Sequence, residues 1–263
     1  MTPNNLAGTS ARATAARLLA SGFALACLAA CDRGPSAAEA AVVAVETGYA
    51  TGQAVDTLGN PIPGARIYLD NTLFNGSWID TRTREDGGYR VQVHPGAWRA
   101  HASFRKDYNG RTYTLRLRPD AVDSFGHEGA VRDFTWQLEG RWPDNDAGFY
   151  GGYIHTSSEI GFENEMEHVE LVLTPDGPLI DGSPGKQLRL RLNDHYWRNL
   201  FQIDDIPIGR YTVTATHQRD GATRPLRVRN WHGEHEPAPE FQLDFLPEHG
   251  STPGASAALV IGN

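Results

Sequence analysis

The chain has 263 residues, of which 40% are hydrophobic and 21% charged, so it is too apolar for a disordered protein and long enough for one or two domains. Its net charge of −8 and its lack of a Lys/Arg run argue against nucleic acid as the main partner. The 28 glycines and 16 prolines follow no triplet period, which excludes collagen and predicts many turns between short strands.

Residues 1–30 predict an export signal. They contain Arg12 and Arg17 but no acidic residue, and the apolar run 18–30 follows. A basic start before a short apolar core is typical of a secretory signal, and this core is shorter than the ~20 residues of a membrane-spanning helix.

The end of this segment, Leu28-Ala29-Ala30-Cys31, resembles the lipobox of bacterial lipoproteins. The resemblance implies cleavage before Cys31 and acylation of that cysteine, for example with palmitate. Cys27 would leave with the signal, so lipidation also accounts for a lone exported thiol. The alternative is an ordinary cleavage site with a chance cysteine.

A lipid anchor would place the protein on the periplasmic or extracellular face of a membrane, with residues 31–47 as a flexible tether. Asp32 resembles the inner-membrane retention signal of enteric lipoproteins. That rule differs between lineages, so the choice between the cell membrane and the outer membrane stays open.

After Gly48 the hydrophobic period is two. Three segments alternate over five or six residues between turn-forming residues, which is typical of half-buried strands: 65–70, 89–93 and 114–118. No later stretch carries a sustained helical period. The sequence therefore predicts an all-β protein, and strand spacing near ten residues favours sandwiches.

Two motifs resemble the carboxypeptidase regulatory-like domain. They are Asn60-Pro61-Ile62-Pro63-Gly64, which leads into a strand, and Glu85-Asp86-Gly87-Gly88-Tyr89, a tight hairpin that needs a positive φ. The resemblance implies a seven-strand, transthyretin-like Greek-key sandwich over residues 48–140. It also places the domain in a group of carbohydrate-binding-like folds.

The second half is predicted to repeat the first, giving two tandem sandwiches. Gly96-Ala97-Trp98 aligns with Gly209-Arg210-Tyr211, and Gly110–Arg118 aligns with Gly221–Arg229. Two further alignments match His127-Glu128 with His235-Glu236 and Asp133-Phe134 with Glu240-Phe241. The alternative is that β turns look alike.

These matches set the predicted domain boundaries. Residues 141–149 form a turn-rich linker, residues 150–246 the second sandwich, and residues 247–263 a loose tail. Gly209 is expected to need a positive φ in its turn, so that Gly209→Val would damage the second sandwich.

Residues that could support catalysis or bind a metal are scarce. None of the ten histidines has a glutamate three residues later, so the zinc site of carboxypeptidases does not carry over. The loop His232–Glu236 has metal-type ligands but reads as a solvated loop, and Asp144-Asn145-Asp146 lacks the EF-hand spacing. We expect no metal, no cofactor and no enzymatic activity, although the sequence leaves open whether His232–Glu236 binds a metal.

Exposed aromatic rings beside polar side chains are the remaining candidate site, because a sugar has an apolar face and polar edges. Trp197, with Asn193 and Asp194 nearby, is the first candidate, and Trp78 at the corresponding end of the first sandwich is the second. Trp98 and Trp136 lie on alternating strands and are expected in the core.

The sequence thus predicts a non-catalytic, lipid-anchored binding or scaffolding protein outside the cytoplasm. A glycan is the first expected ligand, by analogy with the fold group. One alternative is a structural or assembly factor that holds a cell-envelope protein, and another is a hydrolase with an unrecognised site.

Overall fold

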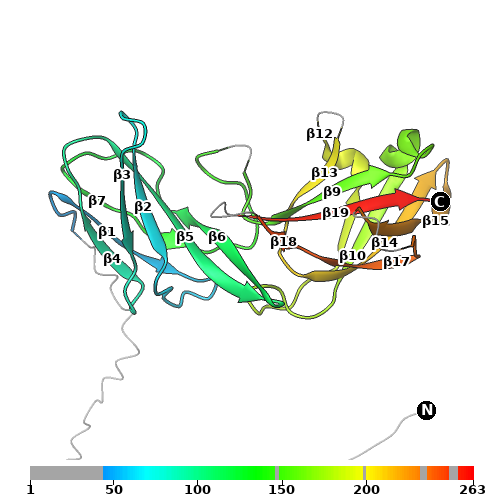
Figure 1. The fold of residues 1–263 in the computed structure, drawn as a ribbon, viewed down its shortest axis with the longest axis horizontal. Helices are drawn as coiled ribbons and strands as arrows, with labels where there is room; N and C mark the ends of the chain where they lie inside the picture. Colours follow the sequence, from blue (N-terminus) through cyan, green and yellow to red (C-terminus); the bar gives the residue numbers. More distant parts are fainter. Residues whose placement is uncertain (1–43, 146–147, 198–199, 232–235, 249–253) are drawn as a thin grey trace, which may run out of the picture. The chain divides into compact units, whose positions relative to one another are not determined.

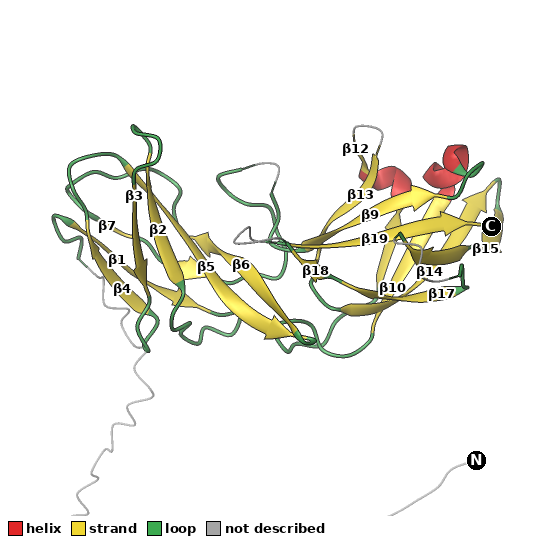
Figure 2. Cartoon of the chain, in the orientation of Figure 1, coloured by secondary structure: helices red, strands yellow, loops and turns green. Residues whose placement is uncertain are grey.

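The chain is all-β, as the alternation predicts (Figure 1). The computed structural model describes residues 44–145, 148–197, 200–231, 236–248 and 254–263. Within these residues the helical elements are two short 3₁₀ helices, drawn red in Figure 2. No helix in this part of the chain has the length and apolar character needed to cross a bilayer. The predicted fold class is therefore confirmed.

The strands between residues 49 and 135 form the N-terminal sandwich. Hydrogen-bonded neighbours run in the order β3-β2-β5-β6-β8-β1-β4, and β7 pairs with β1. One layer is β3-β2-β5-β6, and the pairing of β6 with β8 leads into the other. Alternate residues such as Ile67, Leu69 and Leu117 are fully buried, which confirms the predicted alternation. The strands are β1 (Tyr49–Val55), β2 (Arg66–Asn71), β3 (Trp78–Arg82), β4 (Gly88–Gln92), β5 (Trp98–Tyr108), β6 (Arg111–Pro119), β7 (Ala130–Val131) and β8 (Phe134–Thr135).

Strands β7 and β8 are two ends of one interrupted strand. Ala50 pairs with Ala130 and Ala54 with Phe134, both parallel and in the same register. At the interruption a Cβ on Gly52 would lie 1.9 Å from the backbone oxygen of Arg132. Only glycine allows this close approach, and with β7 and β8 counted together the sandwich has the predicted seven strands.

Residues 152–262 form a second set of strands, and no described strand of this set pairs with the first. One sheet runs β11-β10-β14-β15, with β17 also on β14, and the other runs β12-β13-β9-β19-β16, with β18 on β19. The elements are β9 (Gly152–Ser158), η1 (Glu163–His168), β10 (Val169–Pro175), β11 (Leu188–Arg191), η2 (Leu192–His195), β12 (Tyr196–Trp197), β13 (Leu200–Ile206), β14 (Arg210–Arg219), β15 (Ala222–Pro225), β16 (Arg227–Asn230), β17 (Glu240–Asp244), β18 (Leu246–Pro247) and β19 (Ala255–Gly262).

The two sets follow the same path. The N-terminal order β3-β2-β5-β6-β8-β1-β4 corresponds to β11-β10-β14-β15/β16-β19-β9-β13. In both, the first strand has one parallel neighbour, β7/β8 for β1 and β19 for β9, while the other pairs are antiparallel. This agreement supports the predicted repeat, and its origin by duplication stays a prediction.

The aligned hairpins occupy equivalent places. Asn109-Gly110 and Asp220-Gly221 are two-residue turns with positive φ at both positions, as a type I′ hairpin requires. Leu115 lies opposite Phe104, and the Leu226 N–H donates to the carbonyl of Ala215. Both leucines therefore hold the same register beside the long central strand.

The two aligned Gly-x-aromatic turns also share a packing device. The Trp98 indole donates to the carbonyl of His94 at 2.9 Å, and the Tyr211 hydroxyl donates to the carbonyl of Pro207 at 2.7 Å. Each ring covers its glycine. Gly209 has no positive φ, so that expectation was wrong: a Cβ there would instead lie 2.8 Å from Leu179 Cδ2.

The predicted loose tail is wrong for residues 255–262. They form β19, which lies between β9 and β16 and buries Ala255, Leu259 and Ile261. Segment 255–262 starts with small residues, which are typical of a loop, and its apolar and β-branched residues, which are typical of a strand, come only at its end. The second sandwich therefore extends beyond residue 246.

The alignment of Asp133-Phe134 with Glu240-Phe241 is also wrong. Phe134 pairs with β1, whereas Phe241 lies in β17 and pairs with β14. The N-terminal counterpart of β17 is the single bridge between Trp98 and Phe125. His235 lies outside the described residues, as do Cys31 and the rest of segment 1–43.

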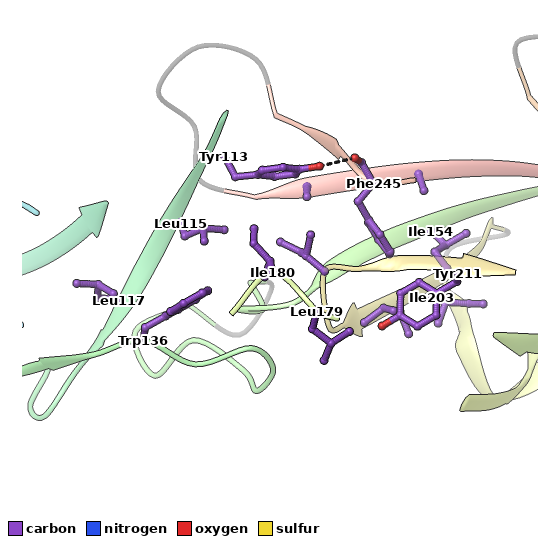
Figure 3. Packing of buried hydrophobic residues seen from close by; sticks show 14 of the residues in the cluster. Tyr113, Leu115, Leu117, Trp136, Ile154, Leu179, Ile180, Ile203, Tyr211 and Phe245 are labelled. Atoms are coloured by element: carbon purple, nitrogen blue, oxygen red, sulfur yellow. Dashed lines mark hydrogen bonds between the residues drawn. The ribbon is translucent and has the colours of Figure 1, made fainter. Parts of the chain in front are cut away.

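The buried apolar side chains of both sandwiches form one contiguous cluster (Figure 3). In it the Tyr113 hydroxyl donates to the carbonyl of Phe245 at 2.7 Å, and burial raises the pKa of Tyr113 to about 12. The linker is tied as well: the Asp205 carboxylate accepts the N–H groups of Gly140 and Gly151. The residues that flank the turn-rich segment 141–149 are thus both hydrogen-bonded to one side chain of β13.

Candidate functional site

The two candidate sites selected from the sequence lie on different sandwiches. Trp78 is 55% exposed at the start of β3, whereas Asn193 and Asp194 are exposed in η2, directly after β11. Trp78 pairs with the end of β2, and Arg191 with the start of β10. β2 and β3 correspond to β10 and β11, so Trp78 and η2 lie at opposite ends of these equivalent strand pairs. The expectation that the candidates lie at corresponding ends of the two sandwiches was therefore wrong. Trp197 lies in β12, and its side chain is outside the described part.

Two elements of the C-terminal sandwich have no counterpart in the N-terminal one. They are η1, between β9 and β10, and η2, between β11 and β12; they contact each other, and Figure 2 shows both helices near β9 and β13. Glu165 holds η1 against β14, because its carboxylate accepts from His217 Nε2 at 2.7 Å and Arg219 Nη1 at 3.0 Å. The pKa of Glu165 lies below its ordinary value, chiefly because of the His217 hydrogen bond.

A cavity of about 610 Å³ lies beside these helices. Its polar lining residues come from β9, η1 and η2, and its apolar lining residues are Met166, Phe201 and Trp231. We call it the Trp231 groove. Its lining residues are Thr156, Ser157, Ser158, Glu163, Asn164, Met166, Glu167, Asn193, Phe201 and Trp231.

A second, more apolar cavity of about 460 Å³ adjoins the groove and shares Thr156, Phe201 and Trp231 with it. Small residues of β19 leave the space for it. The remaining lining residues are His155, Leu246, Ser256, Ala257 and Ala258. The two cavities together offer aromatic and apolar side chains as well as hydroxyl, amide and carboxylate groups.

Of the three residues that line both cavities, Trp231 is the most exposed. It is 50% exposed and directly follows β16, and its backbone N–H donates to the carbonyl of Ala258 in β19. Sequence reasoning missed it. The signal was present, since Trp231 is an aromatic residue between a strand and a polar loop, the same criterion that selected Trp197.

The charged groups on the groove are acidic. Among the described residues, no lysine or arginine lines either cavity, whereas Glu163 and Glu167 line the larger one. The pKa of Glu163 is lowered by its hydrogen bonds to the backbone N–H groups of Glu163 itself and Gly161. Its carboxylate is therefore ionised at neutral pH.

A second polar cluster lies on β5 and β6, under the linker. Arg116 donates to Asp144 at 2.5 Å, lies 4.4 Å from the Trp142 ring centre, and contacts His101 Nδ1 at 3.2 Å. Burial, and then the charge of Arg116, lower the pKa of His101. Asp144 is thus paired with an arginine rather than arranged for Ca²⁺. In the described part of the chain, no group of three or more His, Cys, Asp or Glu side chains is placed to hold a metal.

Comparisons with known proteins identify no family. No family model matches the chain, and no curated protein matches it. Among solved structures, the Bacillus anthracis TIE protein has a TM-score of 0.32 at 10% identity, over 82% of this chain and 34% of its own. Fervidolysin from Fervidobacterium pennivorans, a keratinolytic enzyme related to subtilisin, has a TM-score of 0.28 at 11% identity, over 83% and 30%.

The shaft pilin SpaA from Lactobacillus rhamnosus GG has a TM-score of 0.24 at 11% identity, over 82% of this chain and 98% of its own. The chain spans about a third of the length of the first two structures. At such scores the similarity supports no inference about topology or function, so the function must be argued from the groove itself.

Proposed function

We propose that this protein is a non-catalytic, lipid-anchored binding protein outside the cytoplasm, and that its C-terminal sandwich holds a carbohydrate in the Trp231 groove. The observation that carries the proposal is the half-exposed Trp231 at a cavity that is also lined by hydroxyl and amide side chains. A pyranose presents C–H groups on its faces and hydroxyls around its edge. An aromatic face with nearby hydrogen-bonding groups suits both.

The groove supplies these groups from separate elements. Ser157 and Ser158 come from β9, Asn164 from η1 and Asn193 from η2. Hydroxyl and amide groups both donate and accept, as a ring of sugar hydroxyls requires. Asn193, selected from the sequence as a ligand-binding residue, keeps that role in the proposal, while Trp231 takes the place of Trp197.

The anchor and the domain organisation are part of the same proposal. Cys31 carries the lipid, residues 31–47 form the tether, and the sandwiches cover residues 48–140 and 150–262. Cys31→Ala should move the protein from the membrane to the soluble fraction and abolish palmitate incorporation. A wild-type protein that fractionates as soluble would contradict the anchor.

The test of binding is a glycan array followed by titration of the best ligand with Trp231→Ala. We expect the melting temperature to stay unchanged and affinity to fall at least about tenfold, which is about 1.4 kcal/mol. Leu58→Ala is the control, because Leu58 is an exposed apolar residue of the N-terminal sandwich that lines neither cavity. Equal binding by wild type and Trp231→Ala, or no glycan bound by the wild type, would overturn the proposal.

A specific observation also favours the alternative role as an assembly factor. Leu73 and Phe74, in the connection between β2 and β3, and Trp78, the first residue of β3, are each more than half exposed. Asn71 fixes this loop, because its side-chain oxygen accepts the N–H groups of Leu73 and Phe74. If this loop holds a protein partner, Leu73→Ser with Phe74→Ser should abolish co-purification of that partner while Trp231→Ala leaves it unchanged.

A further inference from the structure

The Trp231 groove continues past η1 and η2 into a third cavity. This cavity, of about 250 Å³, shares Glu167 and Asn193 with the groove. The three cavities therefore adjoin common side chains from β19 past Trp231 to the start of β10, and we call them together the track. The third cavity is lined by Glu167, His168, Val169, Glu170, Arg191, Asn193, Asp194 and Gln218.

We infer that this track binds an oligosaccharide rather than a single sugar, and that the sugars beside η1 and η2 carry positively charged amino groups. The chemical class is a chain of amino sugars without N-acetyl groups. The inference deepens the proposed function and rests on it.

The length of the ligand follows from the continuity of the track. The groove alone has the volume of a typical small-molecule site, and it opens into a cavity at each end. A single ring on Trp231 would leave both outer cavities without a ligand. A chain of several rings can place one on the aromatic side chains and others beside the polar lining residues.

The charge of the ligand follows from the side chains at the η1 end. Glu163, Glu167 and Asp194 are exposed there. Among the described lining residues, the one arginine, Arg191, lies 3.9 Å from the carboxylate of Glu170, and His168 lies 3.4 Å from the carboxylate of Glu167. Three exposed carboxylates therefore line this end beside one arginine and one histidine, each already next to a carboxylate. The exposed carboxylates attract ammonium groups, and they repel uronic acids and phosphorylated sugars, whose charge has the same sign.

The position of these carboxylates is fixed by the opposite side of η1. Glu165 is held by His217 and Arg219 of β14, so the helix keeps Glu163 and Glu167 on the groove. The carboxylates of Glu163 and Glu167 therefore lie on a helix that is already fixed before the ligand binds. Less conformational entropy is lost on binding than with a mobile loop.

The experiment compares defined probes on the full chain by calorimetry. They are a β-1,4-linked hexamer of glucosamine, the N-acetylated hexamer, the glucosamine monomer and a hexamer of galacturonic acid. We expect the glucosamine hexamer to bind at least tenfold more tightly than the N-acetylated hexamer, and the monomer and the galacturonic acid hexamer to bind most weakly. Raising the salt from 150 to 500 mM should weaken only the cationic hexamer.

The variant Glu163→Gln/Glu167→Gln should remove most of the tenfold preference, and Glu85→Gln, an exposed glutamate of the N-terminal sandwich, should leave it unchanged. If the double variant fails to fold, the salt dependence of the wild type decides the point. Equal affinity for the two hexamers, with both lost in Trp231→Ala, would overturn the inference and leave the proposed function standing. A monomer that binds as tightly as the hexamer would overturn the length. If no saccharide binds at all, the proposed function itself is wrong.

Discussion

The two sandwiches share a strand order and differ in their connections. In the N-terminal one, β1 leads to β2 through a turn in which the Asp56 carboxylate accepts the N–H groups of Leu58 and Asn60. The short turn with Gly87 at φ 74° joins β3 to β4. In the C-terminal sandwich these two connections carry η1 and η2, and both helices line the Trp231 groove.

The groove therefore depends on connections that the shared strand framework does not require. Strand order and register agree, so the hydrophobic layers have the same pattern in both halves. Connections lie at the surface and can grow without disturbing the layers, which is why function concentrates there. The N-terminal sandwich, with its tight turns, lacks η1 and η2 and hence the polar lining residues that these helices supply.

The largest expected effect comes from removing β19. Deletion of residues 255–263 takes away a strand between β9 and β16, together with Leu259 and Ile261, each worth ~1.5–3 kcal/mol of burial. That loss approaches the whole stability of a typical domain, ~5–15 kcal/mol. Hydrogen exchange should then show lost protection in β9 and β16, and retained protection in β1 and β5. Full protection of β9 in the shortened chain would mean that β19 is dispensable.

A smaller effect tests whether the two Gly-x-aromatic turns are energetically equivalent. Trp98→Ala and Tyr211→Ala should each lower the free energy of unfolding by ~3–5 kcal/mol, because each ring is at most 4% exposed. Tyr211→Phe, which removes only the hydrogen bond to Pro207, should cost ~0.5–1.5 kcal/mol. Denaturant unfolding measures all three, and a Trp98→Ala cost below that of Tyr211→Phe would contradict the equivalence.

The smallest expected effect is a pH dependence confined to the N-terminal sandwich. Burial and Arg116 hold the pKa of His101 below 6.5, so the unfolded chain binds this proton at a higher pH than the folded chain. Stability should therefore fall as the pH drops from about 6.5 toward 5. In His101→Gln the melting temperature should change less with pH in this window. The carboxylates with lowered pKa values act only at lower pH, so an unchanged slope in His101→Gln would contradict the assignment.

Local patterns predicted much of the fold. The alternation at Ile67 and Leu69 and the positive φ at Gly87 lie where the sequence placed them. The predicted hairpin at Gly87 is wrong, because the turn joins β3 to β4 and these strands pair with β2 and β1 rather than with each other. The alignment of Gly110 with Gly221 agrees with the structure, since both lie in equivalent turns. Each correct prediction depends on interactions within a few residues, which the sequence shows directly. The expected exposure of Trp78 and burial of Trp98 and Trp136 are also confirmed.

The candidate site was less predictable. Asn193 was selected, but Trp231 was not, because the two residues are 38 positions apart and meet only where η2 and the end of β16 line one cavity. The error at β19 has the same origin. Its small first residues look like a loop until β9 and β16 are known to flank them on both sides.

The sequence by itself determined the all-β class, the turns and the faces of the strands, because period and turn chemistry act between near neighbours in the chain. Only the tertiary structure decided which strand lies beside β9, which histidine holds Glu165, and which aromatic ring stands at a cavity. These contacts join residues far apart in the chain, such as Glu165 with His217, 52 positions apart, and Tyr153 with Ser256, 103 positions apart. Their partners are set by the packing of whole layers, which no local pattern records.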